Sequence, residues 1–318
     1  MMRSKKYNNL MRIFLGALTV LVTACQKENP PSTEPVKWAF TYVGDNNTSC
    51  YADRITDYTV PEAFESTVIG PSMYGLTLDR MQKKLYYFDG TENIYRCNYD
   101  FSQPELVGNA GRITGPSNQN AVAGGMISHD RRFYRYEDDG LGMGALVSSK
   151  LDGSDRKHLF EDFIFVGMVG ISRPAEEPYV YFAMSGEKKI YRGNADGTGT
   201  LQLLADLSSD TTFTQISDLE VYKNKLYVGT DKGIYEMSPE GRNMKRIFTE
   251  TAKNIARNGM YLGEREQKLY WISADPDETG VYYGSPYLYE GDLEGIRAAK
   301  LLEQFSNKAN LSVDIQEQ

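Results

Sequence analysis

The stretch GLTLDRMQKKLYYFDGTENIYR, residues 75–96, decides the fold of this chain. It contains a short apolar run opened by a glycine, an aromatic run centred on Tyr86, and a further run that holds Tyr95. Tyrosine suits half-buried pleated surfaces, and short polar stretches separate the three runs. The stretch therefore predicts three consecutive β-strands joined by tight turns.

The same pattern recurs along the chain. Five aromatic runs have central tyrosines separated by 48, 47, 46 and 43 residues, at Tyr86, Tyr134, Tyr181, Tyr227 and Tyr270. A sixth aromatic run, 38–42, lies about one repeat before the first of them. Repeats of this length are typical of propellers and solenoids.

Two further features belong to the repeat. A small residue opens each short apolar run, at Gly75, Gly125, Gly170, Asp218, Gly259 and Asn310. In four repeats, the run that corresponds to the one holding Tyr95 is followed by an acidic residue and a glycine. These pairs are Asp152-Gly153, Asp196-Gly197, Glu240-Gly241 and Glu294-Gly295. Such pairs favour type I′ hairpin turns, which need positive φ, and a short final strand such as 245–248 follows. Each repeat thus predicts four strands, which is the pattern of a propeller blade.

The two ends of the pattern complement each other. The final segment 310–315 has the features of an inner strand with no blade after it, and the first unit begins at Trp38 with no inner strand before it. We therefore predict an all-β, six-bladed β-propeller with four-stranded blades over residues 37–318. In this prediction the C-terminal strand pairs into the N-terminal blade and closes the ring, which removes exposed sheet edges.

The blade at 75–96 resembles the YWTD blade of the low-density-lipoprotein-receptor propellers, and the likeness extends over about 38–315. The four-letter motif appears as Tyr86-Tyr87-Phe88-Asp89 and as Tyr270-Trp271-Ile272-Ser273, so its aspartate is mostly lost. The resemblance implies a propeller fold and a binding role, and it names no ligand.

The N-terminus predicts export. Four basic residues within 3–12 precede an apolar stretch, 13–24, that is too short to span a bilayer and is typical of a signal peptide. The stretch ends at Val22-Thr23-Ala24-Cys25, which resembles the bacterial lipobox, so we expect acylation of Cys25 and cleavage before it. An ordinary signal peptide with a chance cysteine is the alternative.

Residues 25–36 are polar and rich in proline, which indicates a flexible tether. Lys27-Glu28, close behind the cysteine, is similar to the surface-export signal of lipoproteins in the Bacteroidetes. We therefore expect an outer-membrane lipoprotein, held to the membrane through lipid on Cys25 and displayed at the cell surface rather than on the periplasmic side.

The formal net charge of −8 repels the phosphate backbone of nucleic acids, and the sequence contains no basic stripe that could bind it. Nucleic acid is therefore not expected as a partner. Residues 1–24 contribute four positive charges and no negative ones, so the remainder of the chain is more acidic still. A protein or a glycan is the partner that we expect.

Residues at the openings of the inner strands should ring the mouth of the axial channel. We take five of them as a speculative ligand-binding set: Tyr74, Asp218, Arg257, Asn258 and Asn310. The alternative is a polar, water-filled channel without a ligand.

No catalytic residue and no metal site is predicted. His129 falls in a loop and His158 in an outer strand, so neither suits a catalytic triad at the axis. We expect no cofactor; the acidic loop 275–278 could hold Ca²⁺ but lacks the EF-hand spacing. Cys50 and Cys97 lie one repeat apart, and whether they pair stays open.

These features favour a non-enzymatic binding or scaffold propeller that recognises a protein or a glycan. The alternative is a metal-dependent enzyme similar to six-bladed lactonases and hydrolases, which would use Asp218, Asn258 and Asn310 at the axial channel. A third hypothesis is a structural subunit of an outer-membrane assembly.

Overall fold

Antiparallel β-strands make up the regular structure of the described residues, and no helix occurs among them. The computed structural model describes residues 36–316 except for 44–48, 56–61, 68–72, 90–92, 100, 111–125, 139–142, 165–167, 249–254, 264–266, 275–285, 296–299 and 305–310. Residues Val36–Gln316 form one compact unit. The proposed signal peptide 1–24, Cys25 and the tether up to residue 35 lie outside the described residues.

Five four-stranded sheets are each built from four consecutive strands, and we call them blades I to V. Blade I contains β4 (Met73–Asp79), β5 (Lys84–Asp89), β6 (Asn93–Asn98) and β7 (Glu105–Asn109). Blade II contains β8 (Met126–Ile127), β9 (Arg132–Asp138), β10 (Met143–Lys150) and β11 (Lys157–Ile164). Blade III contains β12 (Met168–Ser172), β13 (Tyr179–Met184), β14 (Lys189–Asn194) and β15 (Gln202–Asp206). Blade IV contains β16 (Ile216–Tyr222), β17 (Lys225–Thr230), β18 (Ile234–Met237) and β19 (Lys245–Phe248). Blade V contains β20 (Ile255–Gly263), β21 (Lys268–Ala274), β22 (Pro286–Asp292) and β23 (Lys300–Gln304). The predicted all-β class and the four-stranded antiparallel blade are confirmed.

A further four-stranded sheet, the terminal sheet, combines the two ends of the unit in the order β24-β1-β2-β3. Its strands are β1 (Val36–Val43), β2 (Ser49–Ile55), β3 (Glu62–Thr67) and β24 (Leu311–Gln316). Strand β24 pairs antiparallel with β1, with Asp314 opposite Trp38. The tail strand therefore pairs with the first aromatic run, as its sequence predicts.

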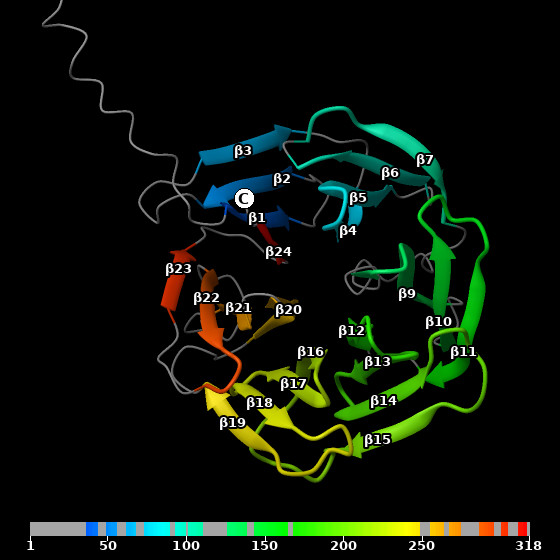
Figure 1. Cartoon of the computed structure of the whole chain (residues 1–318), viewed down its shortest axis with the longest axis vertical. Helices are drawn as coiled ribbons and strands as arrows, with labels where there is room; N and C mark the ends of the chain where they lie inside the picture. Colours follow the sequence, from blue (N-terminus) through cyan, green and yellow to red (C-terminus); the bar gives the residue numbers. More distant parts are fainter. Residues whose placement is uncertain are drawn as a thin grey trace, which may run out of the picture. The chain divides into compact units, whose positions relative to one another are not determined.

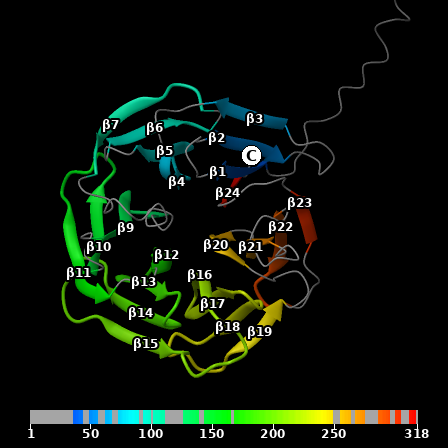
Figure 2. The ribbon, with the colours of Figure 1, turned by 180° about the vertical axis from the view of Figure 1, so that it is seen from behind.

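The sheets stand around a common centre, and Figures 1 and 2, from opposite sides, show β4, β12, β16 and β20 as the innermost strands of their blades. Gly170, in the inner strand β12, explains why small residues open these strands. A Cβ atom at this position would lie 2.1 Å from the backbone nitrogen of Leu219 in β16, and the φ of Gly170 is +57°. Only glycine allows the two inner backbones to approach this closely.

The central tyrosines of the repeat form the core between neighbouring blades. Tyr86, Tyr134, Tyr181, Tyr227 and Tyr270 each keep only 1% of their surface exposed. Each sits in the second strand of its blade, where one face packs against the next blade. Tyr86 meets Phe133 of blade II edge to face, with ring centroids 5.5 Å apart.

The acidic-glycine pairs do mark the turns between third and fourth strands, but their turn type differs from the predicted I′. The glycine φ angles are +84° at Gly153, +80° at Gly197, +71° at Gly241 and +65° at Gly295. The acidic residue before each glycine has no positive φ, and the glycine nitrogen donates to the carbonyl three residues earlier. This arrangement is a type I turn followed by a left-handed glycine, which longer hairpin loops use in place of the two-residue I′ turn.

Cys50 lies in β2 and Cys97 in β6, so both occupy the third strand of their sheet. The side chain of Cys97 is buried, and that of Cys50 is outside the described residues. Whether the two cysteines pair therefore stays open. No helix long and apolar enough to cross a membrane is found in the part of the chain that the structure describes.

Candidate functional site

A polar groove lies between blades II and III on the side of the turns that join first to second and third to fourth strands. We call this side the turn face, and in these two blades it is formed by residues 128–131, 150–156, 173–178 and 194–201. The groove, which we call groove II/III, has a volume of about 400 Å³. Its lining residues are Asp130, Arg132, Tyr134, Ser148, Lys157, Arg173, Pro178, Asn194, Ala195 and Asp196.

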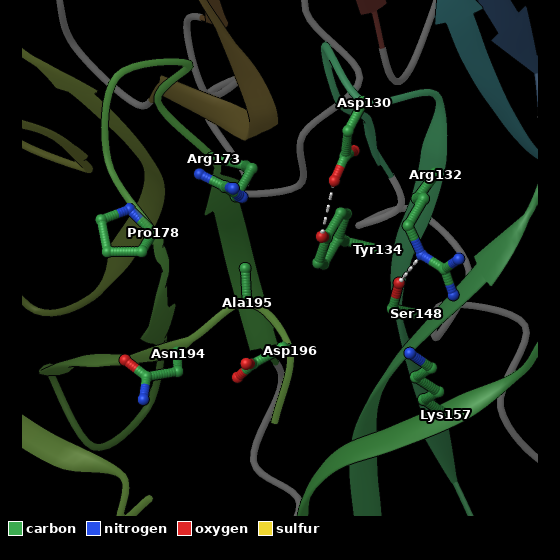
Figure 3. Close-up of a pocket in the computed structure, with 10 residues that line it drawn as sticks. All are labelled: Asp130, Arg132, Tyr134, Ser148, Lys157, Arg173, Pro178, Asn194, Ala195 and Asp196. Atoms are coloured by element: carbon green, nitrogen blue, oxygen red, sulfur yellow. Dashed lines mark hydrogen bonds between the residues drawn. The ribbon is translucent and has the colours of Figure 1, made fainter. Parts of the chain in front are cut away.

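Groove II/III is held rigid by hydrogen bonds within blade II (Figure 3). Arg132 donates from Nε to the hydroxyl of Ser148 at 2.8 Å and from a terminal nitrogen to Asp155 at 2.7 Å. The hydroxyl of Tyr134 donates to Asp130 at 3.4 Å. Burial raises the pKa of Tyr134, and the charge of Asp130 adds to this, so the phenol stays protonated and serves as a donor.

Arg173 lies across the cavity from Asp130 and Tyr134 and comes from blade III (Figure 3). One of its terminal nitrogens donates to the carbonyl of Pro174 at 2.7 Å. Its Nε is buried and has no hydrogen-bond partner. A buried unpaired donor costs about 1–3 kcal/mol, so an anion that reached this nitrogen would recover that cost.

A second groove, groove I/II, lies between blades I and II and has a volume of about 320 Å³. It is lined by Tyr86, Arg96, Val107, Arg131, Lys150, Leu151 and Asp152. Arg131 is held by an ion pair at 2.9 Å with Asp79 of blade I, whose side chain is 1% exposed. Arg96 is bound to Glu105 on the neighbouring strand.

The two grooves occupy equivalent places, one repeat apart. The central tyrosine forms the floor of each, Tyr86 in groove I/II and Tyr134 in groove II/III. The aspartate of a third-to-fourth-strand turn lines each wall, Asp152 in one and Asp196 in the other. The grooves therefore follow from the propeller repeat itself.

Basic groups outnumber acidic ones in both grooves. The acidic groups are occupied locally: Asp152 accepts from Ser154 and Asp196 from Thr198, each through a backbone nitrogen and a hydroxyl. These hydrogen bonds lower the pKa of both carboxyls. Among the described residues, no hydrogen bond or ion pair engages the ammonium group of Lys150 or Lys157. Both ammonium groups act electrostatically on aspartates close by, Lys150 on Asp152 and Asp155 and Lys157 on Asp155 and Asp196, so basic and acidic groups offset each other in the two grooves.

Of the five residues predicted at the axial mouth, Asp218 is the one whose side chain the structure describes. It is 4% exposed, and its two carboxyl oxygens accept from the backbone nitrogens of Leu219 at 2.7 Å and of Met260 at 2.6 Å. Burial raises the pKa of Asp218 to about 7, although both hydrogen bonds oppose this shift. The carboxyl thus joins the inner strands β16 and β20.

The other four residues of that set cannot be placed as a site. Tyr74 lies in β4, and Arg257 and Asn258 lie in β20, but their side chains are outside the described residues. Asn310 and the acidic loop 275–278 are outside them as well. The ligand-binding role of the axial mouth therefore stays a prediction.

His129 and His158 are both exposed. His158 forms an ion pair with Glu161 at 2.7 Å if the imidazole is protonated. The described residues include no group of three histidine, cysteine, aspartate or glutamate side chains with the geometry of a metal site.

The basic residues of the grooves are not among the sites that the sequence predicts. Two pairs of adjacent basic residues, Arg131-Arg132 and Arg156-Lys157, lie at two turns of the same blade. They are the sequence signal that could have revealed the basic residues of the grooves. It is weak, because Arg173 joins them only after blade III packs against blade II.

No family model matches the chain, and no curated protein matches it. Solved structures do share its fold. A chain of a nidogen–laminin complex is 15% identical, with a TM-score of 0.57 over 87% of this chain and 98% of that one. The putative TolB of Agrobacterium tumefaciens is 11% identical, with a TM-score of 0.60 over 90% of this chain and 99% of that one. The periplasmic gluconolactonase of Pseudomonas aeruginosa is 11% identical, with a TM-score of 0.52 over 89% of this chain and 86% of that one. At these identities the similarity establishes a propeller fold and nothing finer.

Proposed function

Since the fold is shared by proteins of different function, we propose a function from the grooves: this chain is a lipid-anchored, non-enzymatic propeller that binds a protein partner through its turn face. In this proposal six blades form a closed ring, residues 1–24 are removed, and lipid on Cys25 holds the domain at the outer surface of the cell. The observation that carries the proposal is the pair of equivalent polar grooves on this face, in which arginine side chains are fixed in position by ion pairs. Preorganised donors on a stiff scaffold suit recognition, because little conformational entropy is lost on binding.

Two features support a protein over a glycan as the partner. The aromatic rings that line the grooves, Tyr86 and Tyr134, are 1% exposed, so they present no flat face on which a sugar ring could stack. In addition, one of the similar structures is itself a complex between two proteins, nidogen and laminin.

Surface display is tested on intact cells that express the full chain. We expect added protease to degrade the chain without lysis, and we expect Cys25→Ser to release it from the membrane fraction. A chain that protease reaches only after lysis would contradict display at the outer surface.

Partner binding is tested by placing a photoreactive residue at Met81, which is 69% exposed in the turn between β4 and β5. The matched control is Leu203 on the outer strand β15, which is 46% exposed. We expect cross-links to a protein at Met81 and not at Leu203. Equal cross-linking at both positions would contradict a role for the turn face.

The second candidate function is a metal-dependent lactonase-like or hydrolase-like enzyme. The observation that favours it is Asp218, a buried carboxyl near the opening of an inner strand whose pKa of about 7 suits proton transfer. Calorimetry of the full chain with Ca²⁺ and with Mn²⁺ separates the two functions. Tight stoichiometric binding that Asp218→Asn abolishes would favour the enzyme over the binding propeller.

A further inference from the structure

Two groups of opposite charge face groove II/III, and neither is held in an ion pair. Asp130, in the turn between β8 and β9, accepts hydrogen bonds from the hydroxyl groups of Ser128 and Tyr134. Arg173, in blade III, donates from one terminal nitrogen to two backbone carbonyls. All of these partners are neutral. As far as the described residues go, no ion pair therefore neutralises the carboxylate of Asp130 or the guanidinium of Arg173.

The two charges lie on opposite sides of the cavity (Figure 3). The hydroxyl of Tyr134 connects them, because it donates to Asp130 and because a hydrogen bond with Arg173 opposes the rise in its pKa that burial causes. The packing of blade III against blade II thus fixes a carboxylate and a guanidinium in place without letting them meet. A ligand with one positive and one negative group can pair with both.

Groove I/II provides a contrast within the same chain. There, an acid of the earlier blade and a base of the later blade meet directly, since Asp79 of blade I and Arg131 of blade II form an ion pair at 2.9 Å. One repeat later, a cavity of about 400 Å³ separates the acid from the base. The gap between the charges is therefore a property of groove II/III and not of the propeller repeat.

The other charges of groove II/III offset one another. Arg132 forms an ion pair with Asp155 at 2.7 Å. Lys157 acts electrostatically on Asp155 and on Asp196. With the facing acid and base included, acidic and basic groups are equal in number, so a ligand with a net charge gains little attraction from a distance. A zwitterion gains from the separate placement of its two charges.

We propose that groove II/III binds a free α-amino acid with a polar side chain. Its ammonium group pairs with Asp130, and its carboxylate pairs with the terminal nitrogen of Arg173 that serves no carbonyl. The cavity of about 400 Å³ falls within the ~300–1,000 Å³ of small-molecule sites. Its far end is polar, with Lys157, Asn194 and Asp196 among its lining residues. The ligand is distinct from the protein partner proposed above, and neither proposal depends on the other.

Binding is measured by calorimetry with the full chain in detergent and three probes: L-asparagine, N-acetyl-L-asparagine and L-asparagine amide. Acetylation removes the positive charge of the amino acid, and amidation removes its negative charge. We expect one L-asparagine per chain. Each blocked probe should bind about tenfold more weakly or worse, because it loses a hydrogen bond between charged groups.

Variants assign each charge to its residue. Asp130→Asn should weaken the binding of L-asparagine about tenfold and abolish its preference over the acetylated probe. Arg173→Gln should abolish the preference over the amide. Each preference compares two probes on the same protein, so a change in stability does not imitate it. The matched control is Asp152→Asn, an exposed aspartate in another turn of blade II that lines groove I/II, and it should change binding less than about twofold.

Four results would overturn the inference. They are no binding of L-asparagine, L-serine or L-glutamine at millimolar concentration, an equal loss in Asp152→Asn, binding of acetate or methylammonium as tight as that of the amino acid, and a preference for L-leucine over L-asparagine. Cross-linking at Met81 tests the protein partner separately, so the proposed function stands or falls independently of these results.

Discussion

At the residue scale, the turn glycines meet two separate demands. Gly241 has a φ of +71°, and a Cβ atom there would lie 2.4 Å from the Cβ of Ala205 in the preceding blade. Gly199 has a similar φ of +78°, but its nearest contact is at an ordinary 3.4 Å. The two positions therefore separate the cost of backbone conformation from the cost of blade packing.

We expect Gly199→Ala to lower the free energy of unfolding by about 1 kcal/mol, since alanine is strained at positive φ. Gly241→Ala should lose about 1–3 kcal/mol more, because its methyl group also overlaps the neighbouring blade. Urea unfolding followed by circular dichroism measures both. Equal losses in Gly199→Ala and Gly241→Ala would show that Ala205 moves to accommodate the added methyl group at no cost in free energy.

Asp218 predicts a pH dependence of stability. Its folded pKa of about 7 lies above the unfolded value of 3.8, so between these values the folded chain binds a proton that the unfolded chain lacks. The stabilisation is therefore fully present below about pH 4 and is lost as pH rises to about 7. Relative to the Asp218→Asn variant, we expect the free energy of unfolding of the unaltered chain to fall by a few kcal/mol between pH 4 and pH 8.

Asp196 supplies the control for this measurement, because its pKa is lowered rather than raised. Its contribution is present above the unfolded pKa and is lost only as pH falls below it. If the stability difference between the unaltered chain and Asp218→Asn does not change from pH 4 to pH 8, Asp218 is not protonated in the folded state.

At the element scale, neighbouring blades interlock through an aromatic ring and a glycine. A Cβ atom at Gly193 in β14 would lie 2.0 Å from Cζ of Phe160 in β11. The same arrangement joins blades IV and V, where a Cβ atom at Gly291 would lie 2.3 Å from Cζ of Phe248. The outer strand of one blade thus packs onto the third strand of the next.

A double-mutant cycle tests this interlock. Gly193→Ala should cost about 1–3 kcal/mol by overpacking, and Phe160→Leu should relieve part of that cost by removing the ring. We expect a coupling of about 1 kcal/mol or more between the two changes. Gly291→Ala combined with Phe160→Leu is the control and should be additive within about 0.5 kcal/mol. Equal coupling in both pairs would refute the contact.

The sequence predicts these elements well because the repeat is local. The aromatic runs, the turn glycines and the small residue at Gly170 can all be recognised within a single blade. The turn type was mistaken because an Asp-Gly pair suits both a two-residue turn and a longer one, and the length of the loop decides between them.

The grooves depend on contacts that no local pattern encodes. Asp130 and Arg173 face each other only after blades II and III have packed, and they belong to different repeats. The same holds for Asp218, whose carboxyl binds a backbone nitrogen of the next inner strand. The direction of these side chains depends on the register between blades. This register cannot be predicted from the sequence of a single blade.

At the scale of the whole molecule, the ends of the unit meet in the terminal sheet, and blades I and V approach each other at the centre. The guanidinium of Arg80, next to β4, lies 4.0 Å from the ring centroid of Tyr261 in β20. A cation over an aromatic ring contributes about 0.5–2 kcal/mol, depending on how far the pair is desolvated. Strand pairing in the terminal sheet therefore joins the two ends of the unit Val36–Gln316, and the cation–ring contact joins blades I and V.

Strand β24 should consequently stabilise the whole domain. Removal of residues 311–318 leaves the inner edge of β1 without its partner and opens the sheet that joins the chain ends. We expect a loss of about 3 kcal/mol or more, which at ~2 °C per kcal/mol lowers the thermal midpoint by roughly 6 °C. Removal of residues 317–318 alone should change nothing, because β1 pairs with β24 only as far as Gln316. Hydrogen exchange should report faster exchange in β1 after the longer truncation, and a synthetic peptide of residues 310–318 should slow it again. A truncated chain that melts with the full one, with β1 still protected, would show that the ring does not need its last strand.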